Sequence, residues 1–200
     1  IEQHIGDWAL ENNLAFETPK QESGKRVAIV GGGPAGLAAA YFLRQRGHAC
    51  TIFEEYGELG GMMVFGIPGY RVPRDVLKGE IQRILDMGVE VKLNTRVGRE
   101  VSVESLESDY DAVFWGIGAV EGKALPMPGA EAPNCVDGMS FLVAFNEGRL
   151  KYLSGRILVI GAGDTAMDVA AVAKRIGNIA EIDESDRPEN VILDKTTHDD

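Results

Sequence analysis

The chain has 200 residues, 44% of them hydrophobic, and a formal net charge of -11 at pH 7. This length and apolar content suffice for one core, or for one core and part of a second. The negative charge excludes a nucleic-acid-binding surface, which needs a basic footprint, and no apolar run approaches the roughly 20 residues that span a bilayer. We therefore expect a globular protein of one or two domains without a nucleic-acid or membrane partner.

The cysteines and histidines form no recognisable metal or redox motif. Cys50 and Cys135 are far apart and make no CxxC pair, and the histidines have no partner pattern around them. No metal site is predicted, and a reducing cytoplasm is the expected location. The chain begins with Ile rather than Met and ends without a turn or cap, so we expect it to be part of a longer protein.

The first third of the chain is predicted to form a short helix and then a strand, helix, strand unit. Apolar residues recur at helical spacing over residues 1–9, and residues 18–24 are typical of an extended linker. Arg26–Val30 is a continuous apolar run of strand length, residues 37–43 continue as a helix, and residues 50–53 form the next strand. This order predicts one βαβ unit.

The rest of the chain ends by repeating the strand, loop, helix pattern. A helix is predicted to begin at Pro73, followed by a strand at residues 89–93 and a buried strand at Ala112–Trp115. After an irregular proline-rich crossing, a helix is predicted at residues 140–147 and a strand at residues 156–160. A second glycine loop then opens another helix, which indicates a second nucleotide-binding domain.

The glycine-rich loop after the first strand is predicted to hold the pyrophosphate of a dinucleotide. In such loops the first glycine makes the tight turn, the second lets the pyrophosphate approach, and the third lets helix pack closely on strand. Gly31, Gly33 and Gly36 have this spacing, and Pro34 and Ala35 complete the turn into the helix. The helix amides and dipole can bind the diphosphate without Lys or Arg. The alternative is a glycine-rich turn in an unrelated α/β domain.

A carboxylate and a second pair of glycines extend this predicted site. Glu54 follows the second strand directly and can accept hydrogen bonds from ribose hydroxyls, and Glu55 competes for the same role. Gly60 and Gly61 would bring backbone close to a ligand, and the alternative is a flexible loop.

The second glycine loop has the same chemistry. Gly161, Gly163 and Ala166 match the dinucleotide spacing, with Ala in place of the third glycine as the fingerprint permits, and Asp164 and Thr165 are predicted to bind the cofactor beside them. Asp164 and Asp168 are not expected to bind metal, since the first fits an N-terminal helix position and the second the exposed first turns.

Together these motifs resemble the two-domain flavoprotein unit of the glutamate synthase small (beta) subunit. The same unit occurs in the N-terminal half of dihydropyrimidine dehydrogenase and in flavoprotein subunits of ferredoxin-dependent transhydrogenases. The distinctive combination is Gly66-Ile67-Pro68 with the stretch from Gly163 to Asp168. The other matching segments are residues 30–36, 53–54, 59–62, 71–73 and 116–118.

The resemblance implies an α/β fold with two Rossmann-like domains, the second inserted into the first and incomplete in this chain. FAD would bind in the first domain, residues 18–125, and NAD(P)H in the second, residues 126–200. Residues 1–17 would end a helical domain that carries iron-sulfur clusters, whose ligands are not in this chain. The matching motifs also imply cofactor contacts at Met62, Ile67 and Gly118.

The implied function is transfer of electrons from NAD(P)H through FAD to iron-sulfur clusters and a redox partner subunit or domain. No acid, base or nucleophile is predicted, because the cofactors carry the chemistry. The family's return segment, which completes the FAD site, is absent from the sequence, so we expect this chain to bind FAD weakly or not at all.

The sequence leaves the nicotinamide cofactor and the electron acceptor open. If residues 179–182 form the strand after the second glycine loop and its helix, Asp183 favours NADH, but an insertion fits the acidic residues 178–190 equally well. Three other functions fit in part: a thioredoxin-reductase-like enzyme, which would need a CxxC; a non-catalytic nucleotide module; and a one-domain NAD-dependent dehydrogenase, which leaves the second loop unexplained.

Overall fold

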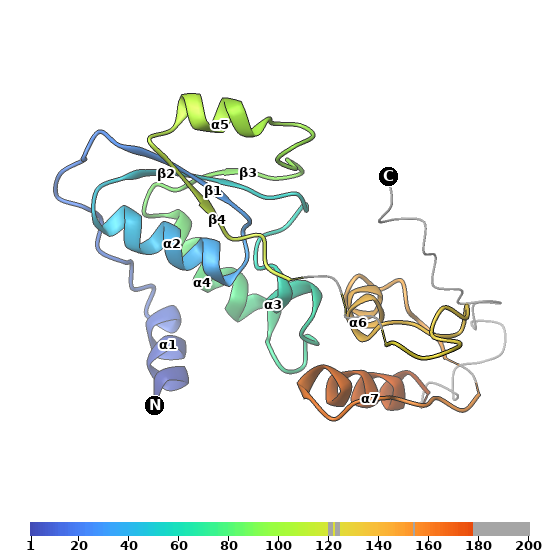
Figure 1. Cartoon of the computed structure of the whole chain (residues 1–200). Helices are drawn as coiled ribbons and strands as arrows, with labels where there is room; N and C mark the ends of the chain where they lie inside the picture. Colours follow the sequence, from blue (N-terminus) through green and yellow to red (C-terminus); the bar gives the residue numbers. More distant parts are fainter. Residues whose placement is uncertain (120–121, 123–124, 154, 178–200) are drawn as a thin grey trace. The chain divides into compact units, whose positions relative to one another are not determined.

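A computed structural model of the protein describes residues 1–119, 122, 125–153 and 155–177. The chain forms two compact units (Figure 1). The first consists of Ile1–Val64 and Val72–Gly118, and the second of Phe65–Arg71 with the described residues from Ala119 onward. None of the described helices is long and apolar enough to cross a membrane.

The first unit is built on a parallel sheet with strand order β3-β2-β1-β4. Its strands are β1 (Arg26–Val30), β2 (Ala49–Phe53), β3 (Glu90–Lys92) and β4 (Ala112–Trp115). β1 and β2 are buried along their last four residues, as expected for apolar strands covered on both faces. The order reverses at β1, so ligands are expected in the crevice outside the carboxyl ends of β1 and β4.

Helices cover both faces of this sheet (Figure 1). α2 (Pro34–Gln45) packs on one face, and α4 (Arg74–Leu85) lies beside it. α5 (Val103–Asp109) covers the other face, where its Leu106 packs against Ala28, Val30 and Phe53. The predicted βαβ unit and the helix after Pro73 are confirmed, as is the N-terminal helix, α1 (Glu2–Glu11).

The prediction that Ala112–Trp115 is a buried strand is wrong about its burial. β4 begins and ends at the predicted residues, but three of its four residues are exposed, including Trp115 at 51%. Among the described residues β4 pairs only with β1, so it lies at an edge of the sheet. An apolar run indicates a strand, whereas burial depends on what covers it.

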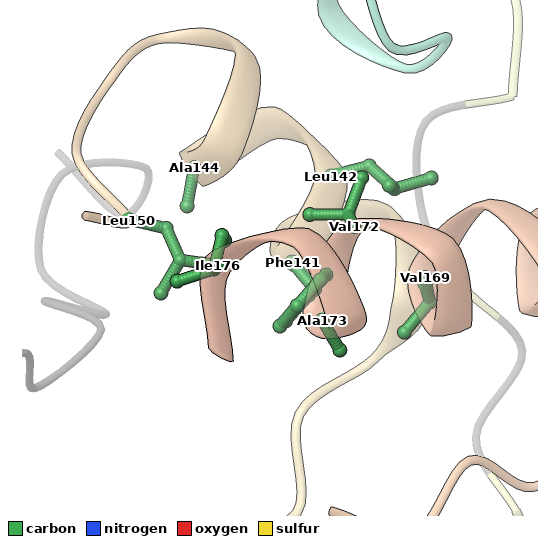
Figure 2. Packing of buried hydrophobic residues seen from close by; sticks show 8 residues of the cluster. All are labelled: Phe141, Leu142, Ala144, Leu150, Val169, Val172, Ala173 and Ile176. Carbon is green, nitrogen blue, oxygen red and sulfur yellow. The ribbon is translucent and has the colours of Figure 1, made fainter. Parts of the chain in front are cut away.

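The second unit contains two packed helices, α6 (Gly138–Asn146) and α7 (Asp164–Gly177). Asp137 caps α6, since its carboxylate accepts hydrogen bonds from the amides of Met139 and Ser140. Figure 2 shows the side chains of the two helices pointing toward one another. The buried cluster consists of Phe141, Leu142, Ala144, Leu150, Val169, Val172, Ala173 and Ile176.

The strand predicted at residues 156–160 is not formed. This segment has no regular structure, and Leu158 and Ile160 are 83% and 61% exposed. A parallel strand needs a hydrogen-bonded neighbour, and none of the described residues supplies one to this segment. The apolar pattern therefore lacks the partner that would make it a strand.

The two thiols should differ sharply in reactivity toward iodoacetamide. Cys50 is 2% exposed, and burial raises its pKa to about 11, whereas Cys135 is exposed. Because the thiolate is the nucleophile, Cys135 should be alkylated at pH 8 while Cys50 stays unmodified until a denaturant is added. Peptide mass spectrometry measures the alkylation of each cysteine. Rapid labelling of Cys50 in the folded chain would show that the core of the first unit is not packed as described.

Candidate functional site

Two glycines where β1 leads into α2, one in the loop and one in the first turn of the helix, leave no room for a side chain. Gly31 has φ +101°, and a Cβ there would lie 2.4 Å from the carbonyl oxygen of Gly116. A Cβ on Gly36 would lie 1.8 Å from the carbonyl oxygen of Gly31. These contacts give physical reasons for the first and third glycines: a left-handed turn out of the strand, and close packing of helix on strand.

Gly33 is different, because the described residues leave room for a side chain there. It is the N-cap of α2 with φ -76°, and no side chain of the described residues caps the helix. A Cβ on Gly33 would meet only the Cα of Gly61, at 3.7 Å. Pro34 occupies the first turn, where the amides of Ala35 and Gly36 have no partner within the helix. The opening of α2 is thus suited to an anion.

Glu54 is buried directly below this loop. Its Oε2 accepts a hydrogen bond from the Gly32 amide at 2.7 Å, and its Oε1 accepts one from the Tyr56 amide at 2.9 Å. A carboxylate can accept about four hydrogen bonds, so capacity remains for ribose hydroxyls. Glu55 instead lies near the surface, with its carboxylate 3.6 Å from Nε of Arg96.

A second loop packs its backbone against the first. Gly60 and Gly61 both have positive φ, and the Gly60 amide donates to the carbonyl oxygen of Gly32 at 2.9 Å. A Cβ on Gly61 would lie 2.8 Å from the Cα of Gly33. Met62 then opens the short helix α3 (Met62–Phe65). Gly118, also with positive φ, ends the first unit, and no described residue would contact a Cβ there.

The glycine loop of the second unit leads into α7. Gly161 has φ +138°, and a Cβ there would lie 3.2 Å from that of Ala166. No described residue would contact a Cβ on Gly163, and Asp164 and Thr165 form the start of α7. Neither glycine loop contains Lys or Arg, so in both loops backbone amides are the groups available to a phosphate.

The prediction that Asp168 is exposed is wrong. Asp168 is 7% exposed, and both of its carboxylate oxygens lie 2.7 Å from one guanidinium nitrogen of Arg71. A carboxylate is buried only when it is paired, and the partner here comes from a distant part of the chain. Ile67 lies in the same segment as Arg71, and its carbonyl accepts a hydrogen bond from Asn146 at 3.3 Å.

No group of three or more His, Cys, Asp or Glu among the described residues could hold a metal ion.

The proposed strand at residues 179–182 and Asp183 lie outside the described residues. The choice between NADH and NADPH therefore stays open.

Two residues that shape the first site were not predicted as site residues. Gly116 limits the space at Gly31, and Gly32 supplies the amide that fixes Glu54. The sequence Gly-Ile-Gly directly after β4 was the signal for Gly116, since a glycine in or beside a strand often marks close approach of another backbone segment.

A parallel sheet of order 3-2-1-4 with a glycine loop at its reversal point defines an α/β nucleotide-binding protein. The chain belongs to the family described as pyridine nucleotide-disulphide oxidoreductase, whose model matches residues 25–197. It is 46% identical over 164 residues to NADP(+)-dependent formate dehydrogenase subunit beta of Moorella thermoacetica, covering 80% of this chain and 23% of that protein. It is 36% identical over 189 residues to the glutamate synthase [NADPH] small chain of Escherichia coli K12, covering 88% and 40%.

These comparisons confirm the α/β fold class and the resemblance to the glutamate synthase small chain. The chain spans less than half the length of these relatives. Among solved structures, Mycobacterium tuberculosis FprA in complex with NADPH has a TM-score of 0.68 at 24% identity, covering 74% of this chain and 36% of that one. This likeness shows the fold alone.

Proposed function

We propose that the chain is part of a flavoprotein oxidoreductase that binds FAD at the loop of Gly31, Gly33 and Gly36 and NAD(P)H at the loop of Gly161 and Gly163. The observation that carries the proposal is the uncapped start of α2, lined by glycine backbone and joined to the buried carboxylate of Glu54. This arrangement offers amides to a pyrophosphate and an acceptor to a ribose.

The protein's share of the chemistry is binding and orientation. The amides of Ala35 and Gly36 would hold the FAD pyrophosphate, and Glu54 would orient the ribose. Met62, Ile67 and Gly118 are further proposed contacts. At the second loop, the start of α7 would hold the NAD(P)H pyrophosphate, with Asp164, Thr165 and Ala166 beside it. Bound flavin would supply acceptance of a hydride and release of single electrons.

The partners follow from the same proposal. The Moorella and Escherichia relatives are named as a subunit and a small chain of larger enzymes. We propose a redox partner subunit or domain here as well, with iron-sulfur clusters outside this chain as the next electron carriers. The proposal also assigns the domains. Residues 18–125 would bind FAD, residues 126–200 would bind NAD(P)H, and residues 1–17 would end a cluster-binding domain.

Anaerobic mixing of the full-length protein with NADH or NADPH tests the proposal. We expect the visible absorption band of the oxidised flavin to bleach with at least one of the two nucleotides. Retention of the band with both nucleotides, in a protein that contains FAD, would contradict the proposed activity.

A non-catalytic nucleotide-binding module is the second candidate function. It is favoured by the second unit, whose described residues contain helices and a glycine loop but no strand. Calorimetric titration of this chain with FAD measures its affinity for the flavin. We expect little or no heat of binding, and tight binding would contradict that expectation.

A further inference from the structure

We propose that Arg71 and Asp168 are positioning residues that fasten the segment Phe65–Arg71 to helix α7. The segment interrupts the sequence of the first unit, since the chain leaves that unit after Val64 and returns to it at Val72. It nevertheless folds as part of the second unit. We refer to Phe65–Arg71 as the strap.

An ion pair attaches the end of the strap to α7. One guanidinium nitrogen of Arg71 donates to both carboxylate oxygens of Asp168, each at 2.7 Å. The side chain of Asp168 is only 10% exposed, whereas that of Arg71 is 48% exposed. A buried carboxylate without a partner is strongly unfavourable, so burial of Asp168 requires that the strap stays in place.

Two further side chains of the second unit hold the strap. Asn146, at the end of α6, donates to the carbonyl oxygens of Phe65 at 2.8 Å and Ile67 at 3.3 Å. The guanidinium of Arg175 lies 3.7 Å from the centre of the Tyr70 ring. The strap is therefore held near its beginning by α6 and near its end by α7.

The attachment links the proposed NAD(P)H-binding helix to a proposed flavin contact. The kinetic effect expected of Arg71 variants therefore rests on the proposed function. Asp168 lies one helical turn after Asp164, so the helix that anchors the strap is the helix whose start would bind NAD(P)H. The strap itself carries Ile67, a proposed flavin contact. The ion pair would thus tie the position of Ile67 to the nucleotide-binding helix.

Hydrogen exchange of the full-length protein tests the attachment independently of any cofactor. In Arg71→Met, amides of the strap should exchange about tenfold faster, while those of residues 169–176 in α7 keep their protection. Arg71→Lys retains a cation and should preserve most of the protection. The control is Lys174→Ala, which removes an exposed charge from the same helix and should change nothing.

Three results would overturn the attachment. They are unchanged strap exchange in Arg71→Met, an equal loss of protection in Arg71→Lys, and faster exchange in Lys174→Ala. If Arg71→Met does not fold, the double variant Arg71→Met/Asp168→Leu removes both charges and leaves no carboxylate unpaired. It should fold and show the same fast exchange of the strap.

Stopped-flow reduction of the flavin tests the positioning role. Arg71→Met should lower the limiting rate at saturating NAD(P)H by about tenfold, with FAD content and nucleotide affinity unchanged, and Arg71→Lys should restore most of the rate. An unchanged limiting rate in a variant with a released strap would refute the role. If wild-type flavin is not reduced, the proposed function fails, and hydrogen exchange still decides the attachment.

Discussion

Replacing Gly36 by alanine should destabilise the first unit by about 3 kcal/mol, because the new methyl group would overlap backbone that cannot move aside. The added Cβ would lie 1.8 Å from the carbonyl oxygen of Gly31 and 3.2 Å from Cγ2 of Ile29. Alanine gains only about 1 kcal/mol over glycine in helix propensity, so the clash decides the sign. Urea denaturation followed by circular dichroism measures the loss.

Gly33→Ala is the matched control, which should leave stability nearly unchanged but weaken FAD binding. Among the described residues its Cβ would meet nothing nearer than 3.7 Å, and φ is -76°, so stability should change by less than about 1 kcal/mol. The methyl group would, however, stand where the pyrophosphate is proposed to approach, and FAD affinity of the full-length protein should fall at least about tenfold. Equal stability of the two variants would show that helix and strand are not packed as closely as described.

Glu54→Gln should weaken both the fold and flavin binding. The carboxylate accepts from the amides of Gly32 and Tyr56, and a glutamine NH2 group cannot accept from either. One backbone amide is then left without its acceptor, which costs about 1 to 3 kcal/mol of unfolding free energy. Loss of the charged acceptor should also reduce FAD affinity about 10- to 100-fold, if Glu54 binds the ribose as proposed.

The control for this second prediction is the neighbouring carboxylate. Glu55 is more exposed and lies 3.6 Å from Arg96, so Glu55→Gln should change stability by no more than about 0.5 kcal/mol. Flavin affinity, measured by fluorescence quenching on titration of the apoprotein, should also be unaffected. A larger effect from Glu55→Gln than from Glu54→Gln would reverse the proposed roles of the two carboxylates.

Local patterns predicted the elements whose determinants lie within a few residues. β1 and β4 begin and end as predicted, because each contains a continuous apolar run that is followed directly by glycine. The helix α5 was missed, since it has only seven residues. Its signal was Ser102, whose hydroxyl accepts from the Ser105 amide as an N-cap.

Features that depend on distant partners could not be predicted from local patterns. Asp168 is buried because Arg71, 97 residues earlier, pairs with it, and no spacing rule joins the two. Similarly, the apolar residues at 156–160 have the composition of a strand, but composition alone does not provide a neighbouring strand. The glycine loops were predictable because their function depends on the backbone, which short sequence motifs control.

The two edges of the sheet differ in their risk of pairing with another chain. β3 is three residues long and exposes the charged Glu90 and Lys92. Its short length and its charged side chains both discourage edge-to-edge association. β4 instead presents Phe114 and Trp115, 38% and 51% exposed, on a strand that pairs on one side only among the described residues. Aggregation of this chain would therefore start at β4, and a lysine in place of an exposed aromatic residue there is the change that would oppose it.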